Sequence, residues 1–200
     1  MSFFMEGSTA VRSVCVYCGS SKGFESVYEE HATQLGIALA ENGYDIVYGA
    51  GSVGLMGVLA DAALKVEGRV IGIIPSFLME YEVYHKGIAE LHEVADMQVR
   101  KRMMMDKSDA FVMMPGGFGT LEEFFEVLTW KQLHLHAKPI GILNVNGYFD
   151  PMLEFVDQMV KAGFVKEQNL QLFGVAKDVP TLLEYLSSPP TQAAEKWITP

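Results

Sequence analysis

The sequence has little cysteine and little positive charge. Its 200 residues include 2 cysteines, and 25 aspartates and glutamates outnumber 15 lysines and arginines. The resulting net charge of −10 argues against a broad phosphate-backbone footprint, because nucleic-acid-binding surfaces draw on many lysines and arginines. We therefore expect no nucleic-acid partner.

Long apolar runs are also missing. No span of about 20 apolar residues could cross a bilayer, and the first residues show no basic-then-apolar leader. A chain of this length can bury enough surface to be stable without a disulfide or a metal. We therefore expect one globular domain, in the cytoplasm and without a membrane partner.

The two cysteines, Cys15 and Cys18, have the Cys-x-x-Cys spacing of redox and zinc sites. No second cysteine pair completes a zinc site, and the histidines form no pair at helical i, i+4 spacing. In a strand, two residues at this odd separation point to opposite faces. We therefore interpret both cysteines as buried structural residues and expect no metal.

Short apolar runs alternate with longer helical patterns. The runs predict strands over residues 13–17, 45–48, 69–74, 110–114 and 139–143. Helices are predicted over residues 26–42, 55–67, 97–107, 121–133 and 151–162. This alternation is typical of a parallel sheet with helices on both faces. We predict a doubly wound, mainly parallel, Rossmann-like α/β domain over residues 13–187, between tails at 1–12 and 188–200.

Glycine-rich segments follow three of the predicted strands. They contain Gly19 and Ser20 after the first strand, Gly51 within 49–54 after the second, and Gly116 and Gly117 after the fourth. Open α/β sheets bind ligands outside the carboxyl ends of their strands. We therefore expect these segments to converge on one crevice.

The segment Gly49-x-Gly51-x-x-Gly54 matches the dinucleotide fingerprint, but its context is wrong for NAD. That fingerprint expects an acidic residue at the end of the next strand, and this strand ends in Ile73-Ile74-Pro75-Ser76. We favour a loop that shapes a nucleotide phosphate or ribose site. A tight turn with close packing at Gly57 is an alternative that requires no ligand.

Residues 115–123 read Pro-Gly-Gly-Phe-Gly-Thr-Leu-Glu-Glu and join a strand pattern to a helix pattern. Glycines let the backbone approach a ligand, and the amides at a helix N-terminus favour a negative group such as phosphate. The upstream cations of 100–102 add to this anion site, although a charge run is also typical of a solvated helix face. Arg100 offers a planar fork that matches phosphate. The methionines at 103–105 are interpreted as core filler.

Glu123 has two interpretations. Thr120 and Glu123 have the spacing of a capping box, which alone would explain the carboxylate. A buried stripe of Leu121, Phe124, Phe125 and Leu128 would instead leave Glu123 beside the glycine turn. There, in the first helical turn, it could act as a base or stabilise a cationic transition state. The spacing alone leaves both open.

Several segments together resemble one known family. They are Arg100-Lys101, the motif at 115–123, Leu128-Thr-Trp-Lys-Gln-Leu133, and residues 138–148, within a similarity that extends from Val14 to about Gly163. The family is LOG, the cytokinin riboside 5′-monophosphate phosphoribohydrolases. The resemblance implies hydrolysis of the N-glycosidic bond of a nucleoside 5′-monophosphate, a cytokinin ribotide or AMP, to free base and ribose 5-phosphate, without metal or cofactor.

The resemblance also implies roles for particular residues. Arg100 and Glu123 match the catalytic pair, and Glu82 matches a carboxylate on the base side. The positions that match nucleotide contacts are Lys101, Gly117, Phe118, Gly119, Thr120, Leu121, Glu122 and Thr129. Two positions depart from the family: Gln98 stands near a usual histidine, and Ala50 replaces a usual glycine in a turn that we expect to be preserved.

The resemblance implies a homodimer with sites near the subunit interface. Helix 121–133, with Trp130, could supply part of that interface or could be buried core. One rival function is a non-catalytic carrier of a nucleotide or of the molybdenum cofactor. Lysine decarboxylation, an older label of the family, is weaker because no pyridoxal-phosphate lysine setting is evident. A single-strand DNA-binding relative of this architecture is disfavoured by the acidic composition.

Overall fold

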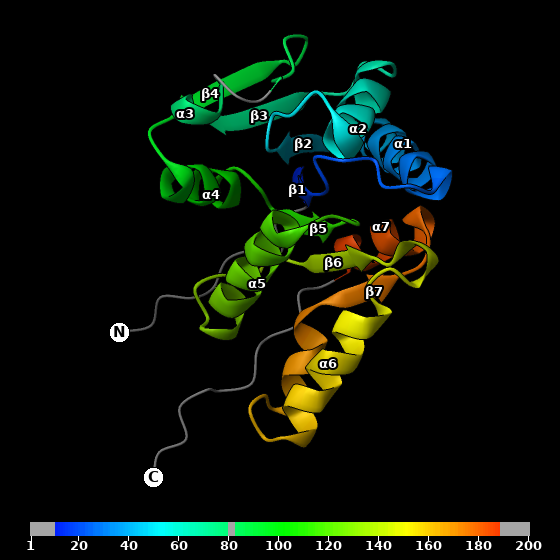
Figure 1. Ribbon diagram of the computed structural model, residues 1–200, viewed down its shortest axis with the longest axis vertical. Helices are drawn as coiled ribbons and strands as arrows, with labels where there is room; N and C mark the ends of the chain where they lie inside the picture. Colours follow the sequence, from blue (N-terminus) through cyan, green and yellow to red (C-terminus); the bar gives the residue numbers. More distant parts are fainter. Residues whose placement is uncertain (1–10, 80–82, 189–200) are drawn as a thin grey trace.

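Seven parallel strands form one sheet in the order β4-β3-β2-β1-β5-β6-β7 (Figure 1). The computed structural model describes residues 11–79 and 83–188. The strands are β1 Ser13–Tyr17, β2 Asp45–Tyr48, β3 Val70–Pro75, β4 Glu90–Val94, β5 Ala110–Met113, β6 Ile140–Leu143 and β7 Gly174–Ala176. The helices are α1 Ser26–Glu41, α2 Gly54–Leu64, α3 Ser76–Met79, α4 Met97–Asp106, α5 Phe118–Gln132, α6 Asp150–Lys161 and α7 Val179–Ser187, with 3-10 turns η1 Val145–Gly147 and η2 Glu167–Leu172.

Each face of the sheet carries its own apolar core. One core joins the sheet to α1, α2 and α7, and the other joins it to α4, α5 and the start of α6 (Figure 1). The strands β1, β2, β3, β5 and β6 are almost wholly buried because helices cover both of their faces. The predicted doubly wound α/β class is confirmed.

The five predicted strands all form, but two edge strands were not predicted. β4 alternates between exposed and partly buried residues before the buried Val94, and β7 has only three residues. Edge strands pair on one side only, so their sequences lack the continuous apolar pattern of central strands. Salt bridges also hold β4 in the sheet, because Arg69, just before β3, pairs with both Asp45 of β2 and Glu90 of β4.

Cys15 and Cys18 lie in opposite cores, as the odd spacing predicted. Both are buried and free, and burial raises the pKa of each thiol well above its usual value. The interpretation as structural residues is confirmed. Within the described residues, no helix is both long and apolar enough to cross a bilayer. The predicted tails lie outside the described residues, except for residues 11, 12 and 188.

The sheet has a switch point between β1 and β5. From β1 the chain adds β2, β3 and β4 on one side, then returns to place β5 against the other side of β1. The loops that leave β1 and β5 therefore run to opposite faces of the sheet and open a crevice at their carboxyl ends. The Gly19 amide donates to the Pro115 carbonyl at 3.0 Å, which holds the two loops together.

Candidate active site

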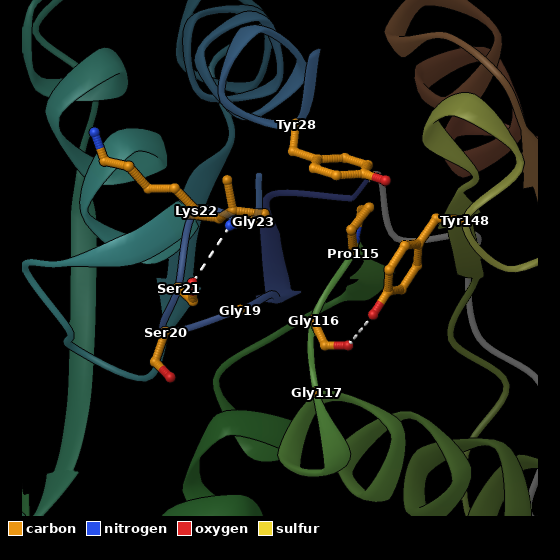
Figure 2. A pocket seen from close by; sticks show the side chains of 11 residues that line it. Gly19, Ser20, Ser21, Lys22, Gly23, Tyr28, Pro115, Gly116, Gly117 and Tyr148 are labelled. Carbon is orange, nitrogen blue, oxygen red and sulfur yellow. Dashed lines mark hydrogen bonds between the residues drawn. The ribbon is translucent and has the colours of Figure 1, made fainter. Parts of the chain in front are cut away.

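A cavity of about 290 Å³ lies at the switch point (Figure 2). The loop after β1, the turn after β5, and the rings of Tyr28 and Tyr148 form its walls. Its lining includes four residues predicted from the glycine-rich segments: Gly19, Ser20, Gly116 and Gly117. The prediction that the first and third glycine segments lie together is confirmed by this cavity. Gly51 is buried and does not line it, and Glu82 lies outside the described residues.

Helix α5 begins at Phe118, with Gly117 as its N-cap and no side-chain cap. The first backbone hydrogen bond of the helix is donated by the Leu121 amide to the Gly117 carbonyl. The amides of 117–120 have no hydrogen-bond partner among the described residues. A Cβ added to Gly117 or Gly119 would meet nothing within 4 Å, so space is open beside these donors. The turn thus presents free amides at the positive end of a helix dipole.

The predicted capping box is wrong. Thr120 lies inside α5 rather than at its N-cap, because the helix starts two residues earlier, at Phe118. The Thr120 side chain is buried under the turn: a Cβ on Gly116 would approach its Oγ1 to 2.2 Å. Glu123 therefore stands in the second helical turn and has no capping role to explain it.

Glu123 is a partly buried carboxyl group surrounded by other titratable groups. Burial raises its pKa to about 7, although the charge of the Arg100 guanidinium acts in the opposite direction. Its charge also acts on Tyr17 and Cys18 at the end of β1. A carboxyl group with a pKa near neutrality can exist in either protonation state at physiological pH, which suits acid–base chemistry.

Arg100 is buried on α4, and its guanidinium is held by backbone oxygens. Its Nε donates to the Ile73 carbonyl and its Nη2 to the Gly49 carbonyl, both at 3.1 Å. Asp96 caps α4 by accepting from the Gln98 and Val99 amides, which fixes the helix that carries Arg100. The side chain therefore spans the carboxyl ends of β2 and β3 with its charge near Glu123.

The other two cations of 100–102 have different roles. Lys101 is buried and donates to Glu122 and Glu126 of α5, at 2.5 and 3.1 Å, so it joins α4 to α5. Burial alone would lower the pKa of Lys101, but these hydrogen bonds raise it. Arg102 is exposed and pairs with Asp106 at 3.1 Å, so the anion site predicted for the whole run does not include it. Met104 and Met105 are core residues, as predicted.

The second glycine segment packs against the first one and against Arg100. Gly49 leaves room for Arg100, since an added Cβ would lie 2.1 Å from its Nη2. Gly54 has a φ of +65°, and a Cβ there would lie 2.2 Å from the Ser20 carbonyl carbon. At Gly57 the corresponding distance to the Ser52 oxygen is 2.1 Å, which is the close packing named above as the alternative that requires no ligand. Ala50 keeps the turn with a φ of +64°, a conformation that favours glycine.

The buried stripe of α5 differs from the predicted one. Its buried residues are Thr120, Phe124, Val127 and Lys131, whereas Leu121, Phe125 and Leu128 are half-buried. Thr129 is exposed and lines a second cavity, of about 200 Å³, between α5, α6 and η2. Thr129 lies six positions after Glu123, which is about 9 Å along the helix axis. Within one chain, Thr129 thus lies apart from the glycine turn.

The fold and this site define a class: α/β proteins with free helix amides and glycine turns at the switch point, suited to an anionic ligand. Comparison with known proteins gives the family. The family described as "Possible lysine decarboxylase" matches residues 56–186. The chain belongs to this family, whose curated members include the cytokinin riboside 5′-monophosphate phosphoribohydrolases called LOG.

Two relatives come from Oryza sativa subsp. japonica. The "Probable cytokinin riboside 5'-monophosphate phosphoribohydrolase LOGL9" is 49% identical over 88% of this chain and 77% of its own length. The enzyme named LOG is 48% identical over 81% of this chain and 67% of its own length. Among solved structures, a molybdenum cofactor binding protein from Rippkaea orientalis superposes with a TM-score of 0.67 at 21% identity, covering 88% of this chain and 96% of its own. That likeness concerns the fold alone.

Proposed function

We propose that the protein hydrolyses the N-glycosidic bond of a nucleoside 5′-monophosphate, a cytokinin ribotide or AMP, to a free base and ribose 5-phosphate. Family membership supports this reaction, and the relatives' names state a phosphoribohydrolase activity. The observation that carries the proposal is Glu123: a carboxyl group with a pKa near 7, beside Arg100 and one turn from four free amides.

The chemistry follows from the charge that develops during cleavage. When the base departs, the ribose passes through an oxocarbenium-like state, and a fixed carboxylate nearby stabilises its positive charge. Ionised Glu123 supplies that carboxylate and orients the attacking water. Arg100 keeps part of the Glu123 population ionised at neutral pH, because its cation opposes the effect of burial.

The 5′-phosphate is assigned to the start of α5. The four free amides of 117–120 and the helix dipole attract a dianion there, and the open space at Gly117 and Gly119 admits it. Arg100 already donates to two carbonyls and Lys101 to two carboxylates. We therefore assign phosphate binding chiefly to the amides. The cation of Arg100 is assigned an electrostatic role beside the ribose.

Incubation of the protein with AMP and with isopentenyladenosine monophosphate tests the reaction. We expect free base and ribose 5-phosphate in equal amounts from at least one of the two. Adenosine, which lacks the phosphate, should be cleaved at least about a hundredfold more slowly, because it loses the amide contacts that position the sugar. Chromatography of the base and an enzymatic assay of the sugar phosphate measure both products.

Two results would contradict the proposal. Folded protein that releases base from neither nucleotide has no such activity. Stoichiometric binding of a nucleotide or molybdenum cofactor without turnover would instead favour a carrier function. A Glu123→Gln sample prepared in parallel shows whether any release comes from a contaminating nucleosidase.

We further propose that the protein is a cytoplasmic homodimer, with its interface on the α5–α6 side. Three large apolar side chains are exposed there: Leu135 by 66%, Phe155 by 60% and Phe164 by 86%. Thr129, which matches a nucleotide contact of the family, faces the same side, so in a dimer it could reach the partner's site. The free cysteines suit a reducing compartment.

Light scattering after size exclusion should give twice the 22.1 kDa chain mass. Phe155→Asp places a charge in the proposed interface and should weaken the dimer at least tenfold. Phe24→Asp, the same change at an exposed phenylalanine in the loop after β1, is the matched control. A monomeric wild type, or equal effects of the two variants, would contradict the α5–α6 interface.

A further inference from the structure

Tyr148 reaches the glycine turn from a distant part of the chain. It follows η1, just before α6, and its hydroxyl donates to the Gly116 carbonyl at 2.7 Å (Figure 2). The turn that it contacts leads into α5 and lies 32 residues earlier. This bond thus links the loop after β6 to the first residues of the proposed phosphate site.

The bond determines where one amide points. The Gly116 carbonyl and the Gly117 N–H belong to the same peptide group, and the described residues contain no cis peptide. In a trans peptide the carbonyl and the N–H point in opposite directions. With its carbonyl held toward Tyr148, this peptide directs the Gly117 N–H away from Tyr148. That N–H is the first of the four free amides at the start of α5.

The ring of Tyr148 is held independently of its hydroxyl. It packs edge-on against Tyr28, with centroids 5.8 Å apart, and against Phe149 at 4.9 Å. The Phe149 amide donates to the Asn144 side chain at 2.8 Å, which fixes the loop. Loss of the hydroxyl alone should therefore leave the ring in place and free only the Gly116–Gly117 peptide to rotate.

The preceding peptide is held in a similar way. The Pro115 carbonyl accepts from the Gly19 amide at 3.0 Å, so two successive carbonyls of the turn have fixed partners on the cavity side. One partner is backbone and the other is the Tyr148 side chain. The Tyr148 hydroxyl is the partner that a substitution can remove, because Gly19 contributes a backbone amide.

We propose that Tyr148 is a positioning residue for the phosphate site, acting through the Gly116–Gly117 peptide. It preorganises the Gly117 N–H as a phosphate donor and need not touch the substrate. This inference rests on the proposed function, because it takes the anion at α5 to be the 5′-phosphate of the substrate. Tyr148 ends the segment 138–148 that resembles the family, but neither that resemblance nor the glycine spacing assigns it a role.

Tyr148→Phe tests the proposal, because it removes only the hydroxyl. The KM for AMP and the Kd for ribose 5-phosphate should each rise about three- to tenfold, the usual effect of one hydrogen bond. The kcat should change less than twofold, since phosphate contacts are made in ground and transition states alike. The Kd for adenosine, which lacks phosphate, should stay unchanged. Calorimetric titration gives the Kd values.

Tyr44→Phe is the matched control. It makes the same chemical change at a half-buried tyrosine just before β2, outside the residues that line the cavity, so it keeps the Tyr148 ring and the bond to Gly116. Its affinities should equal those of the wild type. Equal weakening of adenosine and ribose 5-phosphate in Tyr148→Phe would indicate a general structural role and overturn the inference, as would unchanged affinity for both.

The test separates this inference from the proposed reaction. Wild-type protein that binds ribose 5-phosphate but hydrolyses no nucleotide would contradict the reaction, while the Kd values still decide the role of Tyr148. Wild-type protein that binds neither AMP nor ribose 5-phosphate would overturn both, because no phosphate site would exist.

Discussion

Glu123→Gln should reduce turnover of the nucleotide about a thousandfold or more and, at pH 8, make the protein more stable than the wild type. The pKa of Glu123 is raised from 4.5 to about 7 in the folded protein. The folded state therefore holds a proton that the unfolded state has lost between these values, and stability falls as pH rises through this window. Glutamine is neutral and removes that cost.

The size of the stability gain follows from the pKa shift. One pKa unit corresponds to about 1.4 kcal/mol, and the carboxyl group is only partly buried, so we expect a gain of about 2 kcal/mol at pH 8. At pH 4, below the unfolded pKa of 4.5, the wild-type carboxyl is protonated in both the folded and the unfolded state, and the gain should nearly vanish. Thermal or urea unfolding at both pH values measures the difference.

The loss of activity has a separate cause. Glutamine has the shape of glutamate but no negative charge, so it cannot stabilise the cationic ribose. Glu184→Gln makes the same chemical change at an exposed position of α7, away from the α5–α6 side, and should alter neither turnover nor the pH dependence of stability. Full activity of Glu123→Gln would show that the carboxylate is not catalytic. If Glu123→Gln were instead less stable than the wild type at pH 8, ionised Glu123 would have a structural role.

Much of the fold was predictable because the central strands are buried on both faces. β1 and β2 begin and end at the predicted residues, and β5 and β6 differ by one residue at one end. β4 could not be recognised in this way, since its polar residues Glu90 and His92 occupy a sheet edge. Its stability depends on partners such as Arg69, which is distant in sequence.

The sequence predicted which segments form the site, but not the contacts between those segments. The glycine segments and the cations stood out by composition, whereas the start of α5 was placed three residues late because glycines disfavour helices. That displacement produced the false capping box. Tyr148 ends a segment that resembles the family, but its bond to Gly116 could not be predicted, because that bond depends on the pairing of β5 with β6 in the folded sheet. Tertiary contacts of this kind have no periodicity to detect.

The Arg100 guanidinium combines a charge with two backbone contacts, and two substitutions separate these roles. Arg100→Gln removes the cation that lowers the pKa of Glu123, so the pH at which activity is half-maximal on the acid side should rise above 7. Turnover at pH 7 should fall about a hundredfold or more. Arg100→Lys keeps the charge, so that midpoint should stay near 7. Rates measured from pH 5 to 9 give both values.

Arg100→Lys tests the contacts instead. A lysine has one nitrogen and cannot reproduce the fork that bonds the carbonyls of Ile73 and Gly49, so at least one buried acceptor loses its partner. We expect a loss of about 1–3 kcal/mol in unfolding free energy. If Arg100 mainly gripped the phosphate, both variants would raise the KM for AMP without moving the acid midpoint, and adenosine hydrolysis would be unaffected. A midpoint that shifts in Arg100→Gln alone, with adenosine as well as with AMP, assigns its charge to Glu123, because adenosine carries no phosphate whose own titration at about pH 6 could move that midpoint.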